Sequence, residues 1–204
     1  MFITIEGIEG TGKSTVTNAL SQMLASVSLN VCTTREPGGT VIAEDIRKVL
    51  LNSYTEESVQ SDVELMLMFA SRLQHVEAKI KPALARGEFV LCDRFTDASY
   101  AYQGGGRGIS LAKIAELHNW AIGDFQPDKT FLLDLEPKLA LERVLLRNNG
   151  KDRIEQESIA FFERVRSTYL ELAKKEPKRF IVIDAGQAPN AVMAEIWQEV
   201  RAWI

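Results

Sequence analysis

The chain has 204 residues, of which 46% are hydrophobic and 25% are charged, and its net charge is −4. This length fits one domain or at most two, and it is sufficient to bury a large core without a disulfide or a metal. The charged fraction is ordinary for a folded protein and excludes a wholly disordered chain. The acidic balance argues against a protein that nucleic acid holds by net charge, and the sequence has no apolar run of roughly 18 residues that could span a membrane.

The N-terminus, the cysteines and the histidines further limit the expected location and partners of the protein. Residues 1–6 lack a basic stretch followed by a long apolar segment, so we expect no secretion signal. Cys32 and Cys92 each lie in an apolar run without a second ligand at metal spacing, and two free thiols are typical of a reducing compartment. His75 and His118 lie in helical stretches, far apart in sequence, and neither is assigned to a site. We therefore expect a cytoplasmic protein with no membrane partner and no nucleic-acid partner.

Short apolar runs alternate with longer helical patterns along the chain. We expect buried strands over residues 3–6, 31–35, 89–93, 130–135 and 180–184. Helical patterns lie near residues 14–26, 40–51, 62–86, 110–123, 137–147, 155–175 and 190–203. Strands that alternate with helices predict a three-layer α/β/α fold, with a five-stranded parallel sheet and helices on both faces. Ligands of such folds bind beyond the carboxyl ends of the strands.

The first predicted strand runs directly into Gly7-Ile8-Glu9-Gly10-Thr11-Gly12-Lys13-Ser14. This segment fits the pattern G-x-x-x-x-G-K-[ST] ahead of a helix. Glycines at these positions let backbone N–H groups converge on phosphate oxygens, and the helix start adds its positive dipole end. Lys13 suits the β- and γ-phosphates, and the Ser14 hydroxyl suits Mg²⁺. The sequence therefore predicts a P-loop NTPase fold that binds a nucleoside triphosphate through this segment.

The remaining motifs narrow the class of P-loop protein. A GTPase needs a base-reading N-K-x-D motif, which this sequence lacks, and larger ATPases carry further motifs that are also missing. A small kinase that passes the γ-phosphoryl group to a small acceptor is the remaining interpretation. A non-catalytic nucleotide-binding module is the alternative from another class. The presence of Lys13, Ser14, Asp93 and Arg94 favours the kinase.

Three further segments follow predicted strands. They read R-E-P-G-G-T at residues 35–40, D-R-F at residues 93–95 and A-S-Y-A-Y-Q-G-G-G-R-G at residues 98–108. Together with the P-loop, and in this order, they resemble the bacterial thymidylate kinase family over nearly the whole chain. The resemblance implies phosphoryl transfer from ATP to dTMP with Mg²⁺, giving ADP and dTDP, in one kinase domain over residues 1–204. Another nucleoside monophosphate as acceptor stays an alternative.

The resemblance also implies a dTMP-binding site. Arg94 and Arg47 are expected to hold the phosphate, and Arg72 to donate to thymine O4. Tyr100, or in second place Tyr102, is expected to crowd the ribose 2′ position. Met68 and Phe69 are alternatives for packing on the thymine ring face. Met68 is favoured because it lies on the helical face that carries Arg72. The implied dTMP-binding set is Glu36, Pro37, Gly38, Arg47, Met68, Phe69, Arg72, Arg94, Ser99, Tyr100 and Gln103.

The resemblance implies roles at the ATP end as well. Ser14 and Asp93 are the implied Mg²⁺ ligands, Asp93 through water. A mobile lid near residues 143–155 is expected to supply arginines, and Gln187 is expected near the adenine. The implied ATP-binding set is the whole P-loop with Arg143 and Gln187, and the implied catalytic set is Lys13, Glu9, Arg94, Arg147 and Arg153. The family is homodimeric, and the helix near 62–86 is the expected interface.

Overall fold

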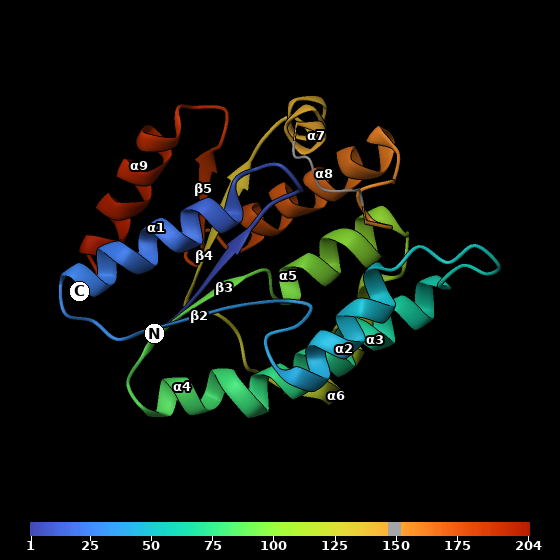
Figure 1. Cartoon of the computed structure of the whole chain (residues 1–204), viewed down its shortest axis with the longest axis horizontal. Helices are drawn as coiled ribbons and strands as arrows, with labels where there is room; N and C mark the ends of the chain where they lie inside the picture. Colours follow the sequence, from blue (N-terminus) through green and yellow to red (C-terminus); the bar gives the residue numbers. More distant parts are fainter. Residues whose placement is uncertain (147–151) are drawn as a thin grey trace.

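The computed structural model describes residues 1–146 and 152–204 and has three layers, with a central sheet between helices (Figure 1). Five parallel strands pair in the order β2-β3-β1-β4-β5. Their bounds are β1 (Phe2–Glu6), β2 (Val31–Arg35), β3 (Phe89–Asp93), β4 (Lys129–Asp134) and β5 (Phe180–Asp184). The predicted fold class is confirmed, and each strand lies within one residue of its predicted bounds.

The helices follow the predicted order, except that α5 and the segment after it, between β3 and α6, were not predicted. Their bounds are α1 (Lys13–Ser26), α2 (Val41–Leu51), α3 (Ser61–His75), α4 (Lys81–Ala85), α5 (Thr96–Ser99), α6 (Leu111–Ile122), α7 (Pro137–Leu145), α8 (Ile159–Lys175) and α9 (Pro189–Arg201). The helix predicted near 62–86 contains a π-helical segment, η1 (Val76–Ile80), between α3 and α4. A second π-helical segment, η2 (Tyr100–Gly106), continues α5 through a glycine run that gave no helical pattern in the sequence.

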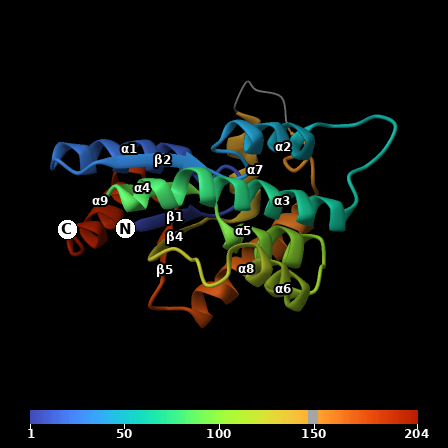
Figure 2. The same cartoon turned by 90° about the horizontal axis from the view of Figure 1, so that it is seen from below.

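Strand β1 shows how the two faces of the sheet are covered. Ile3 and Ile5 belong to a buried cluster with Leu20 of α1. Phe2 points the other way and packs in a second cluster with Ile80 of η1, as the alternation of side chains along a strand requires. Helix α9 contacts α1 and β5, whereas α8 contacts β4 and β5, and Figure 2 shows α1 and α8 on opposite sides of β1 and β4.

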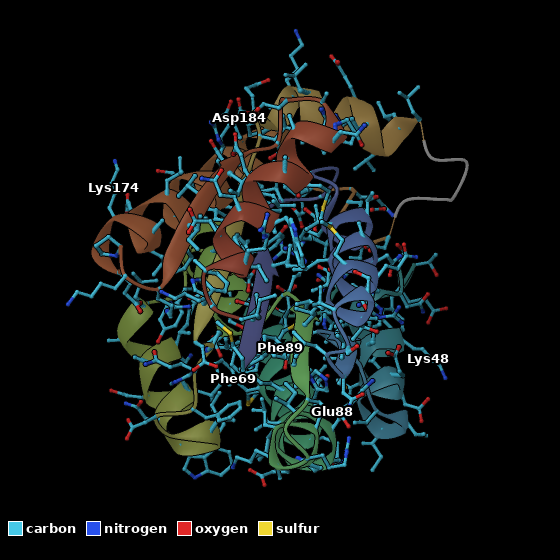
Figure 3. All side chains as sticks on the ribbon, turned by 90° about the vertical axis from the view of Figure 1, so that its left-hand side faces the viewer. Lys48, Phe69, Glu88, Phe89, Lys174 and Asp184 are labelled. Atoms are coloured by element: carbon cyan, nitrogen blue, oxygen red, sulfur yellow. The ribbon has the colours of Figure 1, made fainter. Side chains whose placement is uncertain are left out.

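The surface is charged, and long lysines such as Lys48 of α2 and Lys174 of α8 point outward (Figure 3). Within the two described stretches, no helix combines the length and the apolar content that crossing a bilayer requires. Cys92 is buried and Cys32 is half-buried, and both are free thiols.

The parallel register decides which loops meet. Ile5 of β1 pairs with Asp93 of β3, which in turn pairs with Arg35 of β2. The segments that follow these three strands therefore start at the same edge of the sheet. They are the glycine-rich segment at 7–14 and the motif segments after residues 35 and 93, so the topology brings the predicted ligand-binding segments together.

At Gly105 and Gly106, segment η2 packs against α8 so closely that no side chain would fit at these two positions. A Cβ atom at Gly105 would lie 2.1 Å from Oγ1 of Thr168, and one at Gly106 would lie 2.4 Å from Cε2 of Phe161. The Arg164 guanidinium of α8 donates to the carbonyl oxygens of both glycines at 3.2 and 2.9 Å. The glycine run is therefore required for this contact, which fixes η2 beside the carboxyl edge of the sheet.

We predict that Gly106→Ala lowers the free energy of unfolding by about 1–3 kcal/mol, because the new methyl group must displace the buried Phe161 ring. In a helix without this contact, the same change would be stabilising. Urea unfolding followed by circular dichroism measures the effect. Glu116→Ala, on the exposed face of α6, is the control and should change stability by less than about 0.5 kcal/mol. An equally small effect of Gly106→Ala would contradict the close packing.

Candidate active site

The glycine-rich segment forms a loop between β1 and α1. The Lys13 ammonium and the Thr11 hydroxyl both donate to the carbonyl oxygen of Ile8, at 2.8 and 2.9 Å. Gly12, with φ of 93°, stands at the N-cap of α1 without a side chain that could cap it. The first N–H groups of α1 consequently have no side-chain cap, as an anion-binding helix start requires.

Burial changes the titration of Lys13. Only 8% of Lys13 is exposed, and burial lowers its pKa to about 8, with the charge of Arg94 acting in the same direction. The carboxylates of Asp93, Glu9 and Glu6 partly oppose this shift. An anion placed beside the ammonium would raise the pKa again, so this site favours the binding of negative charge.

Ser14 and Asp93 face each other just beyond Lys13. The Ser14 hydroxyl donates to Oδ2 of Asp93 at 3.1 Å, which joins the start of α1 to the end of β3. Hydroxyl and carboxylate oxygens are hard ligands of the kind that Mg²⁺ prefers. Among the described residues, no group of three or more His, Cys, Asp or Glu side chains could hold a metal. Two such oxygens fit an ion that takes its other ligands from phosphate and water, as Mg²⁺ usually does.

Arg94 links the end of β3 to the P-loop. Its backbone φ is 71°, a left-handed conformation that is uncommon outside glycine. Its guanidinium donates to the Gly7 carbonyl and to Oε1 of Glu9, both at 2.7 Å, and lies over the Tyr102 ring at 4.8 Å. The Tyr102 hydroxyl donates to Oε2 of the same Glu9 carboxylate at 2.7 Å. Arg94 and Tyr102 thus hold both oxygens of Glu9.

A second arginine lies at the other end of the site. Arg72 of α3 is 2% exposed, and it donates to Oε2 of Glu36 at 2.7 Å, to Oγ of Ser99 at 2.9 Å and to the Phe95 carbonyl at 2.9 Å. These three bonds use three of its five N–H groups. The side chain is therefore fixed while two donors are left for a ligand.

A cavity of about 260 Å³ joins the two arginines. The residues that line it come from the P-loop, the start of α1, the ends of β2 and β3, helices α2, α3 and α5, segment η2 and the turn before α8. They are Glu9, Gly10, Gly12, Lys13, Ser14, Thr15, Arg35, Glu36, Pro37, Arg47, Leu51, Met68, Arg72, Asp93, Arg94, Ala98, Ser99, Tyr102, Gln103, Asp152, Ile154 and Glu155.

The structure distinguishes Met68 from Phe69, the two alternatives for the thymine ring face, and Tyr100 from Tyr102, the two alternatives for the ribose 2′ position. Met68 lines the cavity, whereas Phe69, 2% exposed, packs in a buried cluster with Leu65 of the same helix. Tyr102 lines the cavity, whereas Tyr100 packs against that same cluster. Of the two tyrosines, the structure thus places the second choice, Tyr102, at the site and not Tyr100, because the π-helical turn of η2 directs residue 102 toward the P-loop.

Other predicted residues are not among those that line the cavity. Ile8 is a core residue that contributes its carbonyl, and Gly38 donates its N–H to Ser71. Arg143 donates to the Ala185 carbonyl at 3.0 Å, and Gln187 donates to Glu195. The Gly7 carbonyl accepts from Arg94, and the Thr11 hydroxyl donates to the Ile8 carbonyl within the loop.

The predicted lid falls partly outside the described residues. These exclude residues 147–151, and Arg147, the arginine predicted to bridge to ATP, is among them. Arg153 is described, but its guanidinium donates to Glu64 at 2.6 Å and to the Leu50 carbonyl at 2.9 Å. It is not among the residues that line the cavity, so the structure does not bring this predicted catalytic residue to the P-loop.

Four buried groups near the site were missed from the sequence. His75 contacts Oε1 of Glu36 at 3.0 Å and Oγ1 of Thr34 at 2.6 Å, so the histidine left unassigned supports the carboxylate that holds Arg72.

Glu6 accepts from the Tyr169 hydroxyl at 2.7 Å, and burial, with the charge of Asp97, raises the pKa of Glu6 to about 8. Tyr169 also accepts from Arg94 at 3.3 Å. Glu64 is the fourth group. The sequence signal that could have found these four residues is that each is a polar residue within an otherwise apolar, periodic run.

Comparisons with known proteins agree with this geometry. The thymidylate kinase family profile matches residues 5–196. The chain is 52% identical to a thymidylate kinase of Pseudomonas syringae pv. tomato over 96% of this chain and 92% of that protein. It is 50% identical to one of Ruthia magnifica over 96% and 94%. A crystal structure of thymidylate kinase from Ehrlichia chaffeensis matches with a TM-score of 0.78, 34% identity and 98% coverage of both chains. With a P-loop, a cavity that extends from it and relatives of this identity, the chain belongs to the thymidylate kinase family.

Proposed function

We propose that this chain transfers the γ-phosphoryl group of ATP to dTMP and releases ADP and dTDP. One observation carries the proposal: a single cavity runs from Lys13 in the P-loop to the fixed donors of Arg72. The first end suits a triphosphate and the second suits the base of a small acceptor. The membership in the thymidylate kinase family supports ATP and dTMP as the two substrates.

The phosphate end acts mainly through positioning and charge neutralisation, as phosphoryl transfer requires. Lys13 places a cation beside the triphosphate, and Arg94 offers its remaining N–H groups to the acceptor phosphate. Glu9 holds the Arg94 guanidinium at 2.7 Å and so sets its direction. Arg47 donates to the Pro37 carbonyl at 2.9 Å and lines the cavity, which supports its proposed role as a second phosphate contact.

Mg²⁺ is part of this proposal. Ser14 and Asp93 would hold it, since their oxygens already face each other at 3.1 Å. When bound, the ion supplies positive charge that offsets the phosphate oxygens.

The base end selects by its pattern of donors and acceptors. The two unused N–H groups of Arg72 match O4 of thymine or uracil and oppose the amino group of cytosine. A buried donor left without a partner costs about 1–3 kcal/mol. Ser99, which pairs with Arg72 at 2.9 Å, and Gln103 both line the cavity and are the groups that meet the N3 side of the base. The 5-methyl group adds only about 0.8 kcal/mol, so dUMP should be a weaker substrate.

Several further parts of the proposal concern organisation. We expect residues 1–204 to act as one kinase domain with a lid near 143–155, and Arg143 and Gln187 to lie near the adenine. We also expect a homodimer. Exposed apolar side chains on α2 and α3, namely Val41, Ile42, Val63 and Met66, support an interface there. The two free thiols support a cytoplasmic location.

A panel of acceptors tests the function. Release of ADP in a coupled assay with ATP and Mg²⁺ should be strong with dTMP, weaker with dUMP, and nearly nil with dCMP and purine monophosphates. Lys13→Ala should lower kcat by about 100-fold or more, because charge stabilisation of the transferring group is lost. Preference for another monophosphate would redirect the acceptor assignment. ATP binding without turnover on any acceptor would favour the non-catalytic binding module.

The pH dependence of ATP binding tests Lys13. Its pKa of about 8 in the free protein must rise when phosphate binds, so binding takes up a proton above that pH. The Kd for ATP should therefore increase as pH rises from 7 to 9, by up to about tenfold per unit above pH 8. Lys13→Arg stays charged and should show a flat profile. If the dependence persists in Lys13→Arg and disappears in Glu6→Gln, the titrating group is Glu6 instead.

The two tyrosines can be tested against each other. Tyr102→Ala should reduce the preference for dTMP over its ribonucleotide by about tenfold, since the ring that limits space at the 2′ position is removed. Tyr100→Ala should leave that ratio unchanged, because Tyr100 packs away from the cavity. The measurement is kcat/KM for both nucleotides. The reverse result would restore the role of Tyr100 that the sequence suggested.

A further inference from the structure

A buried carboxylate, Glu64, lies directly behind the base end of the cavity. It is fully buried in α3, four residues before Met68 and eight before Arg72, so all three share one helical face. Its Oε1 accepts from Nε2 of Gln103 at 2.8 Å and from Nε of Arg107 at 3.3 Å. Its Oε2 accepts from Nη2 of Arg107 at 3.2 Å and from Nη2 of Arg153 at 2.6 Å.

This carboxylate is ionised at neutral pH. Burial alone acts to raise the pKa of Glu64, but hydrogen bonds and charges from Gln103, Arg107 and Arg153 outweigh it and lower the pKa. An ionised carboxylate can only accept hydrogen bonds. The end of the Gln103 amide that faces Glu64 must therefore be its NH₂ group. Since Gln103 also lines the cavity, its carbonyl oxygen is the end available to a ligand.

We propose that Glu64 is a positioning residue for base specificity, because it fixes Gln103 with the carbonyl oxygen toward the acceptor base. This inference rests on the proposed function. The wall then presents a donor from Arg72 beside an acceptor from Gln103. Thymine and uracil present the complement, an O4 acceptor beside an N3–H donor, whereas cytosine presents the reverse pattern. Without Glu64, the amide can turn and serve either pattern.

The main test is Glu64→Gln, in which the new amide can donate as well as accept. The ratio of kcat/KM for dTMP to that for dCMP should fall by about tenfold or more. The KM for dTMP should rise, whereas kcat at saturating dTMP and the KM for ATP should stay within about twofold. Glu157→Gln is the matched control, since Glu157 pairs with the same Arg107 but does not contact Gln103. It should keep the wild-type ratio.

The outcomes separate the possible failures. An equal loss with dTMP and dCMP in Glu64→Gln, or the same change in Glu157→Gln, would show a structural role only and overturn the proposal. A wild-type protein without preference for dTMP over dCMP would remove the proposed function itself, before any variant is compared.

A second measurement does not depend on how the variant folds. In the wild-type protein, NMR can follow the side-chain NH₂ protons of Gln103 during a dTMP titration. If these protons face Glu64, they should exchange slowly with solvent before dTMP is added, and their shifts should change little on binding. Fast exchange in the free protein, or a large shift that reports direct contact with the base, would overturn the assignment.

Discussion

Buried pairs of arginine and glutamate hold the substrate cavity in shape. Arg94 pairs with Glu9 and Arg72 pairs with Glu36, both at 2.7 Å, and in neither pair is more than 15% of a side chain exposed. In each pair the carboxylate fixes a guanidinium that keeps further N–H groups for a ligand. Removing one member would leave an uncompensated buried charge, which typically costs about 3–5 kcal/mol. The same ion pairs therefore maintain the fold of the cavity wall and fix the direction of its donors, which the proposed function assigns to phosphate and base.

These pairs depend on the parallel sheet. Glu9 follows β1, Glu36 follows β2 and Arg94 follows β3, and the register aligns the ends of these strands. Supporting contacts come from elements that lie far away in sequence. Tyr169 of α8 bonds both Arg94 and Glu6. A change in α8 can thus reach the phosphate end without touching a substrate.

Much of this arrangement could be predicted from the sequence, because local signals were strong. Apolar runs marked the strands, and the glycine spacing with Lys13 marked the phosphate loop. The helical period placed Met68 on the face of Arg72, and Met68 does line the cavity. The identity of Tyr102 could not be derived, since the run that contains it shows no helical pattern and its π-helical phase depends on contact with α8. His75 gave no signal because its partners, Thr34 and Glu36, come from another strand and the loop after it.

The contact between η2 and α8 determines where this enzyme can be redesigned. Tyr102 and Gln103 are carried by a segment whose next glycines already touch α8 without a gap. Segment η2 therefore cannot shift toward α8 to make room for a bulkier base. Met68 of α3 is half-buried and lines the same cavity, and its unbranched side chain can adopt several shapes. The cavity therefore combines a rigid segment, η2, with one adaptable side chain, and under the proposed function the capacity to accept new bases would lie with Met68.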